Sequence, residues 1–130
     1  KTGGKNKALK FEIAKSIAGF LNAAGGRLIV GVADNGAING VNEEMRKFYP
    51  TKDDYLKLLS DIIKEKITMK FVNLIDYDLK QVDDVDLLVV NIKQSKSECY
   101  VDKDLYVRMS PATVKLDGEE LVRYVKERFN

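Results

Sequence analysis

The chain has 130 residues, 45% of them hydrophobic, which is enough for one globular domain with a single core. Its 22 basic and 20 acidic residues give a formal charge of +2, too small to indicate a nucleic-acid-binding protein by itself. One cysteine rules out an internal disulfide, and the absence of histidine rules out the usual zinc sites and Ser-His or Cys-His catalysis. The single cysteine leads us to expect the reducing cytoplasm. No apolar run is long enough to span a bilayer, so we expect no membrane partner.

The first predicted elements are a helix and a hairpin. Apolar residues recur at three- and four-residue intervals from Ala8 to Ala23, which predicts a helix with one buried face that Gly25 and Gly26 end. The branched apolar run from Arg27 to Ala33 predicts a buried strand. An Asp-Asn-Gly sequence at 34–36 then predicts a tight turn, with a returning strand at 37–41.

The second half of the chain alternates in the same way between helix and strand patterns. Thr51 is placed to cap a helix that continues to about Lys66, and Asp117 is placed to cap a last helix. Between them we expect strands at 71–80 and 85–93, joined by a turn at 81–84, and shorter strands at 99–101 and 105–109. This order predicts an α+β fold, a mostly antiparallel sheet with about three helices packed on it.

The glycines between residues 25 and 40 do not form a conventional nucleotide-binding loop. Gly25 and Gly26 follow a helix and lead into a strand, the reverse of a Walker loop, and the later glycines lack the dinucleotide-binding spacing. The simpler interpretation is structural, with helix caps and turns. It leaves Asn22 and Asp34 as polar groups at the two ends of a buried strand, although Asn22 could equally satisfy the helix terminus.

Charged residues offer two kinds of site. Without histidine, catalysis would depend on carboxylates with a divalent metal, but the five aspartates at 76–86 are more simply a solvated hairpin, and Cys99 a small core residue. Arg108 stands at the end of an apolar strand, where its fork of donors suits a phosphate. Candidate phosphate-binding residues near glycines, a helix end or the Ser110-Pro111 loop are Lys5, Lys7, Lys10, Arg27, Arg108 and Lys115.

A set of motifs extends over most of the chain. The first and most specific block is Phe20-Leu21-Asn22, Gly25-Gly26, Leu28 to Val32, Asp34-Asn35-Gly36, Ile38 and Gly40-Val41. The later motifs are Tyr106-Val107-Arg108 with Thr113 and Leu116, and a closing Tyr-x-x-x-Arg-Phe segment at 124–129. Together these motifs resemble the Schlafen AlbA-type domain, a family described as DNA-binding. Cys99 departs from the proline that the family often has near this position.

The resemblance implies a Schlafen AlbA-like domain over residues 1–130 that binds DNA or structured RNA, with Asn22 among the contacts. Because the sequence opens without methionine, we expect it to be part of a longer prokaryotic chain, a transcriptional regulator or defence protein. Animal Schlafen domains cleave tRNA and rRNA with two glutamates and an aspartate. Asp34 best matches that aspartate, whereas the glutamates would precede Lys1.

Three functions therefore remain open at the level of sequence. The first is nucleic-acid binding through a basic face, without a cofactor. The second is an endoribonuclease that uses Asp34 and Mg²⁺ or Mn²⁺ in a longer parent protein, so the enzymatic status of this segment stays undecided. The third is a nucleotide-sensing or protein-interaction module. Related animal proteins pair two similar lobes in one chain, which leaves homodimerisation as one arrangement for a single lobe.

Overall fold

The structure, a computed structural model, describes residues 2–31 and 51–130, with the backbone alone at residues 2–6 and 52. Helix α1 spans Thr2–Asn22 and begins well before the predicted start at Ala8, because Gly3 and Gly4 conceal its first turns by their low helix propensity. Its buried stripe includes Ile13, Ile17 and Leu21, as the spacing predicts. The predicted turn at 34–36 and returning strand at 37–41 lie outside the described residues.

The first sheet is antiparallel, with the order β1-β3-β2. Strand β1 spans Gly26–Val30, β2 spans Ile75–Val82 and β3 spans Val85–Ile92. Asp83 and Asp84 form the tight turn between β2 and β3, both with positive φ. The predicted strand start at residue 71 is wrong, because residues 69–74 form a 3₁₀ helix in which Phe71 is buried.

The second helix is confirmed together with its cap. Helix α3 spans Lys52–Ile62, and the Thr51 hydroxyl accepts a hydrogen bond from the backbone N–H of Asp54 at 3.1 Å. One π-helical segment, η1, continues the chain over Ile63–Ile67, close to the predicted end, and the 3₁₀ helix η2 follows over Met69–Leu74. Apolar residues of α3 and η1 face the core.

A second three-stranded antiparallel sheet, in the order β4-β5-β6, replaces the single sheet expected from the sequence. Strand β4 spans Tyr100–Val101, β5 spans Asp104–Met109 and β6 spans Ala112–Leu116. The sequence prediction missed β6, because proline and serine at 110–111 indicated a loop. Helix α4 spans Gly118–Phe129 and is confirmed, although the Asp117 side chain makes no capping hydrogen bond.

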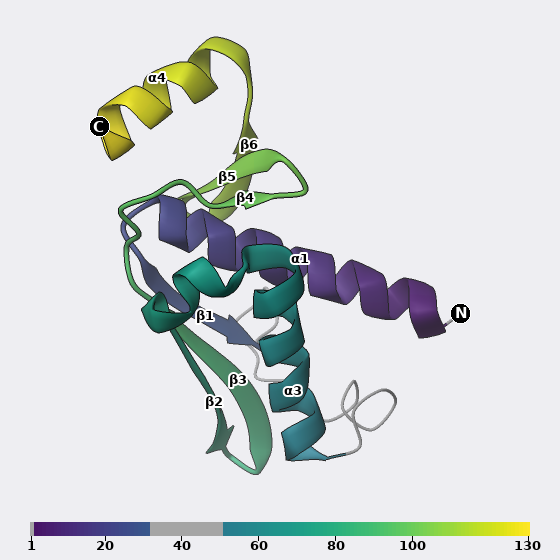
Figure 1. Cartoon of the computed structure of the whole chain (residues 1–130). Coiled ribbons are helices and arrows are strands. Elements are labelled where there is room, and N and C mark those ends of the chain that lie inside the picture. The colour runs from purple at the N-terminus through teal and green to yellow at the C-terminus, as the bar shows by residue number, and fades with distance from the viewer. Residues whose placement is uncertain (1, 32–50) are drawn as a thin grey trace.

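Helix α1 lies between the two sheets and joins them into one body (Figure 1). Sheet β4-β5-β6 covers one side of α1, while α3 and the first sheet lie on the other. One core cluster takes residues from α1, α3, η1 and both sheets. The α+β class is confirmed, and the second sheet with α4 lies on the side of α1 away from the first sheet (Figure 1).

Candidate nucleic-acid interface

Helix α1 ends on a fully buried polar residue, Asn22. Its Nδ2 donates to the carbonyl oxygens of Cys99 and Tyr106, both at 2.8 Å, and its Oδ1 accepts from the backbone N–H of Cys99 at 2.8 Å. Through these three bonds the side-chain amide of Asn22 connects the end of α1 to the second sheet. The Asn22 side chain is therefore occupied by the fold, and we leave it out of the interface.

Helix α4 is anchored to the same end of α1. The Tyr124 hydroxyl donates to the Asn22 carbonyl at 2.6 Å, and the Arg128 guanidinium donates to the carbonyls of Ala23 at 3.0 Å and Ser95 at 2.6 Å. Burial raises the pKa of Tyr124, and the adjacent Arg128 partly offsets that rise. Both side chains belong to the closing Tyr-x-x-x-Arg-Phe motif. In this structure the motif therefore caps the C-terminus of α1.

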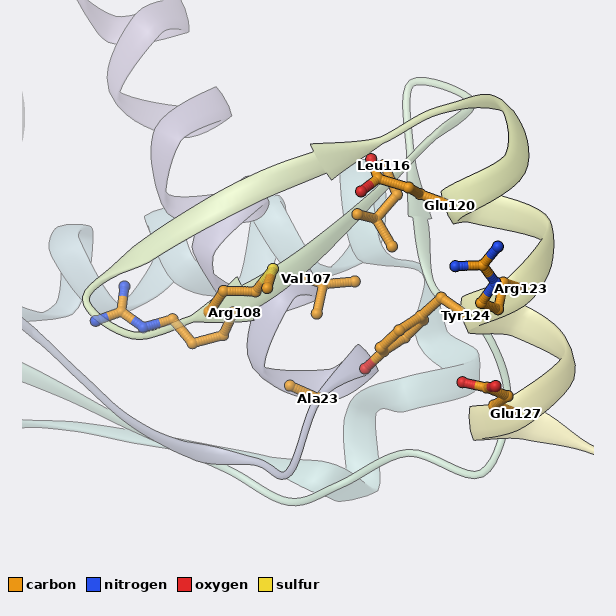
Figure 2. A pocket seen from close by; sticks show the side chains of 9 residues that line it. Ala23, Val107, Arg108, Leu116, Glu120, Arg123, Tyr124 and Glu127 are labelled. Carbon is orange, nitrogen blue, oxygen red and sulfur yellow. The ribbon is translucent and has the colours of Figure 1, made fainter.

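A groove of about 340 Å³ lies between α4 and the β5-β6 hairpin. Figure 2 shows Val107, Leu116 and Tyr124 around it, with Glu120 and Arg123 on the α4 side. The Arg108 side chain extends away from these residues (Figure 2). Successive residues of a strand point to opposite faces, so Val107 belongs to the groove and the Arg108 side chain to the face that meets α1.

Close packing of α1 on the β5-β6 hairpin depends on Gly19. A Cβ at this position would lie 2.9 Å from Thr113 Cγ2 and 3.3 Å from the backbone nitrogen of Arg108. The hairpin could not approach as closely if residue 19 had a side chain. The short approach brings basic residues of the helix and of the hairpin onto a common surface.

Arg108, Lys15 and Lys115 lie on the α1–hairpin face around this contact, and Lys7 lies on the same side of α1 nearer its start; we call these four residues the basic face. The Phe11 and Tyr106 rings meet edge to face at 6.3 Å, and the Lys15 ammonium lies 5.5 Å and 5.8 Å from their centroids. Lys115 is the cross-strand neighbour of Tyr106, and an exposed Lys7 lies one helical turn before Phe11.

Arg108 pairs with no acidic side chain among the residues that the structure describes, whereas Lys15 and Lys115 of the basic face each have an acidic partner. Its guanidinium carbon lies 5.1 Å from the centroid of the Phe20 ring. Its Nε, and the hydroxyl of its cross-strand neighbour Thr113, are buried without a hydrogen-bond partner in the same described ranges. Lys15, in contrast, pairs with Glu12 at 3.0 Å.

The remaining candidates from the sequence are dispersed. Arg27 is exposed on β1, in the first sheet, where its Nε donates to Asn91 Oδ1 at 2.9 Å, and Lys10 is half-buried on α1. Lys5 lies in α1 and its side chain is not described, while Asp34 lies outside the described residues. The sequence prediction missed Lys15, although its spacing of four residues from Phe11 already put both on one helix face.

Neither a metal site nor a reactive thiol is found in the described part of the chain. No group of three or more acidic or cysteine side chains there could hold a metal ion. Burial raises the pKa of Cys99 to about 12, against a smaller opposite effect of Lys70, which agrees with a core residue. Among residues 2–31 and 51–130, no helix is long and apolar enough to cross a membrane.

Comparison with known proteins identifies the family. The model of the family described as Schlafen, AlbA_2 matches residues 1–117. The chain belongs to the Schlafen AlbA_2 family. This membership associates it with nucleic-acid-related domains and assigns no specific function. Helix α4, with its anchoring residues Tyr124 and Arg128, follows the matched range.

One solved structure has the same fold as this AlbA_2 domain. The crystal structure of the DIP2311 protein from Corynebacterium diphtheriae superposes with a TM-score of 0.67 at 22% identity. The alignment covers 93% of this chain and 22% of that one, so the domain spans about a fifth of the length of its structural neighbour. No curated protein matches the sequence.

Proposed function

We propose that this AlbA_2 domain binds the phosphate backbone of a nucleic acid through the basic face. The observation that carries the proposal is the state of Arg108, a half-buried guanidinium held beside Phe20 with no acid paired to it in the described ranges. Arginine presents a rigid fork of donors that matches phosphate oxygens, and a guanidinium without an internal counter-charge gains most from binding one.

The lysines of the basic face add charge around this arginine. Lys15 and Lys115 pair with Glu12 and Asp117 at 3.0 Å and 4.0 Å, and both acids are more than half exposed. Such surface pairs contribute at most about 1 kcal/mol each, so a phosphate can replace the acids at little cost. Family membership, which concerns nucleic acid, supports the same partner.

The aromatic residues beneath the basic face favour a structured partner, either duplex DNA or folded RNA. Phe20 and Tyr106 are each only 8% exposed, so their rings are covered by the protein. Proteins that hold single strands usually expose aromatic rings on which bases stack. We therefore expect the domain to contact the phosphate backbone and to show little base-sequence specificity. Such binding would let a regulator or defence protein attach to nucleic acid of any sequence.

The test is the binding of the 130-residue chain to labelled duplex DNA, single-stranded DNA and tRNA at two salt concentrations. We expect affinity to fall steeply with salt, and Arg108→Ala to weaken binding about tenfold and reduce the salt slope by about one. Arg123→Ala removes the same charge from α4 and serves as the control, with a change of less than about twofold. Salt-independent binding, or equal effects of the two substitutions, would contradict the proposal.

A further inference from the structure

A second pocket lies at the end of the first sheet, away from the basic face. It has a volume of about 620 Å³ and forms where β1 begins, β3 ends and η2 leads into β2. A backbone hydrogen bond of 2.9 Å from Lys93 N–H to the Leu74 carbonyl joins two of the segments that line it. Its size lies within the range of about 300–1,000 Å³ typical of small-molecule sites. Its polar side chains are Asn73, Asp76, Asn91 and Lys93.

The strand register orders the hydrogen-bonding groups of this pocket. Arg27, Asn91 and Asp76 are direct neighbours across β1, β3 and β2, so they form one row on the same face of the sheet. Arg27 Nε donates to Asn91 Oδ1 at 2.9 Å. Because a guanidinium only donates, this bond fixes the orientation of the Asn91 amide and leaves its NH₂ group as a donor.

The pocket therefore offers an acceptor beside a donor. Among the described residues, the Asp76 carboxylate and the Asn91 NH₂ group take part in no hydrogen bond or ion pair. A ligand that fits must present N–H donors to the carboxylate and an acceptor to the adjacent amide. The Lys93 ammonium group is a cationic donor at the wall of the pocket. Arg27 adds a second positive charge next to Asn91.

Guanine matches this pattern better than the other bases. Its neighbouring N1–H and N2–H₂ groups can both donate to one carboxylate, while O6 beside them accepts from an amide or ammonium group. Adenine, cytosine and uracil each present only one donor group on the corresponding edge. We propose that this pocket binds the guanine base of a nucleotide, with Asp76 and Asn91 reading the base and Arg27 next to its phosphate.

The test uses the isotope-labelled 130-residue chain and NMR titrations with GMP, AMP, CMP and UMP. We expect GMP to cause saturable shifts of the Asn73 and Asn91 side-chain amides, with an affinity at least tenfold above that of AMP. Asp76→Asn should weaken GMP binding at least tenfold. Asp78→Asn is the matched control, since it removes the same charge from an exposed residue two positions along the same strand, and it should leave GMP affinity unchanged.

Several results would overturn this assignment. They are the absence of saturable shifts with GMP, equal affinities for all four nucleotides, tighter binding of AMP, or equal effects of the two aspartate substitutions. Inorganic phosphate alone should shift Arg27 and leave the Asn73 side-chain amide unchanged, and equal shifts of Asn73 with phosphate and with GMP would contradict recognition of the base. Because the pocket and the basic face are separate surfaces, Arg108→Ala should leave GMP binding intact, so failure of one proposal is distinguishable from failure of the other.

Discussion

Replacing Asn22 by alanine tests the junction between α1 and the second sheet. The substitution removes three hydrogen bonds of 2.8 Å and leaves the Cys99 N–H and two carbonyls buried without partners. Each lost bond contributes about 1 kcal/mol, and a buried N–H without a partner adds about 1–3 kcal/mol. We therefore expect the free energy of unfolding to fall by about 4–6 kcal/mol, a large part of the 5–15 kcal/mol typical of a domain.

Urea denaturation monitored by circular dichroism measures this loss. With a slope near 2 kcal/mol/M, the midpoint should fall by about 2–3 M. Asn73→Ala, at an exposed position of η2, is the control and should change the midpoint by less than about 0.3 M. Asn22→Asp keeps the shape but turns an oxygen toward two carbonyls, so it should be at least as destabilising as alanine. A loss below about 1 kcal/mol for Asn22→Ala would refute the reasoning.

Two further predictions concern Cys99 and Gly26. Because the pKa of Cys99 is raised from 9.0 to about 12, the folded state keeps a proton that the unfolded chain loses; its contribution to stability is complete below about pH 9 and declines as the pH rises toward 12. A thiol reagent should therefore modify Cys99 at pH 8 only after unfolding, and rapid modification of the native protein would argue against this burial. Gly26→Ala places a Cβ 2.6 Å from the Phe20 ring at a φ of +152°, and should cost about 2–4 kcal/mol in urea denaturation. The cost should shrink in a Phe20→Leu background, and an equal cost in both backgrounds would show that the ring is not responsible.

Local chemistry made some elements predictable. Thr51 has the residue type of an N-cap and the following acids suit a helix dipole, so the start of α3 could be placed to the residue. The β2-β3 turn was likewise readable, since Asp tolerates the positive φ that Asp83 and Asp84 adopt. The sequence prediction missed strand β6 because Pro111 indicates only a turn. A turn residue does not predict whether the residues after it pair with an earlier strand.

The candidate sites depended on contacts between distant residues, which local patterns do not contain. Asn22 bonds to residues 77 and 84 positions away, and its buried state could not be distinguished from an accessible one in the sequence. Arg108 was found from its place at the end of an apolar strand, but the Thr113 hydroxyl beside it requires the register of β6. The row of Arg27, Asn91 and Asp76 likewise exists only once three strands are aligned.

The anchoring of α4 on α1 has a consequence for how the chain folds as it is synthesised. The last carbonyls of the first helix accept hydrogen bonds from residues 102 and 105 positions later, on Tyr124 and Arg128. When α1 leaves the ribosome these partners do not yet exist, and the helix end must stay hydrated until nearly the whole domain has emerged. Closure of the domain is thus a late step that depends on its final helix, and a chain stopped at Asp117 would retain every strand and still leave α1 without these partners.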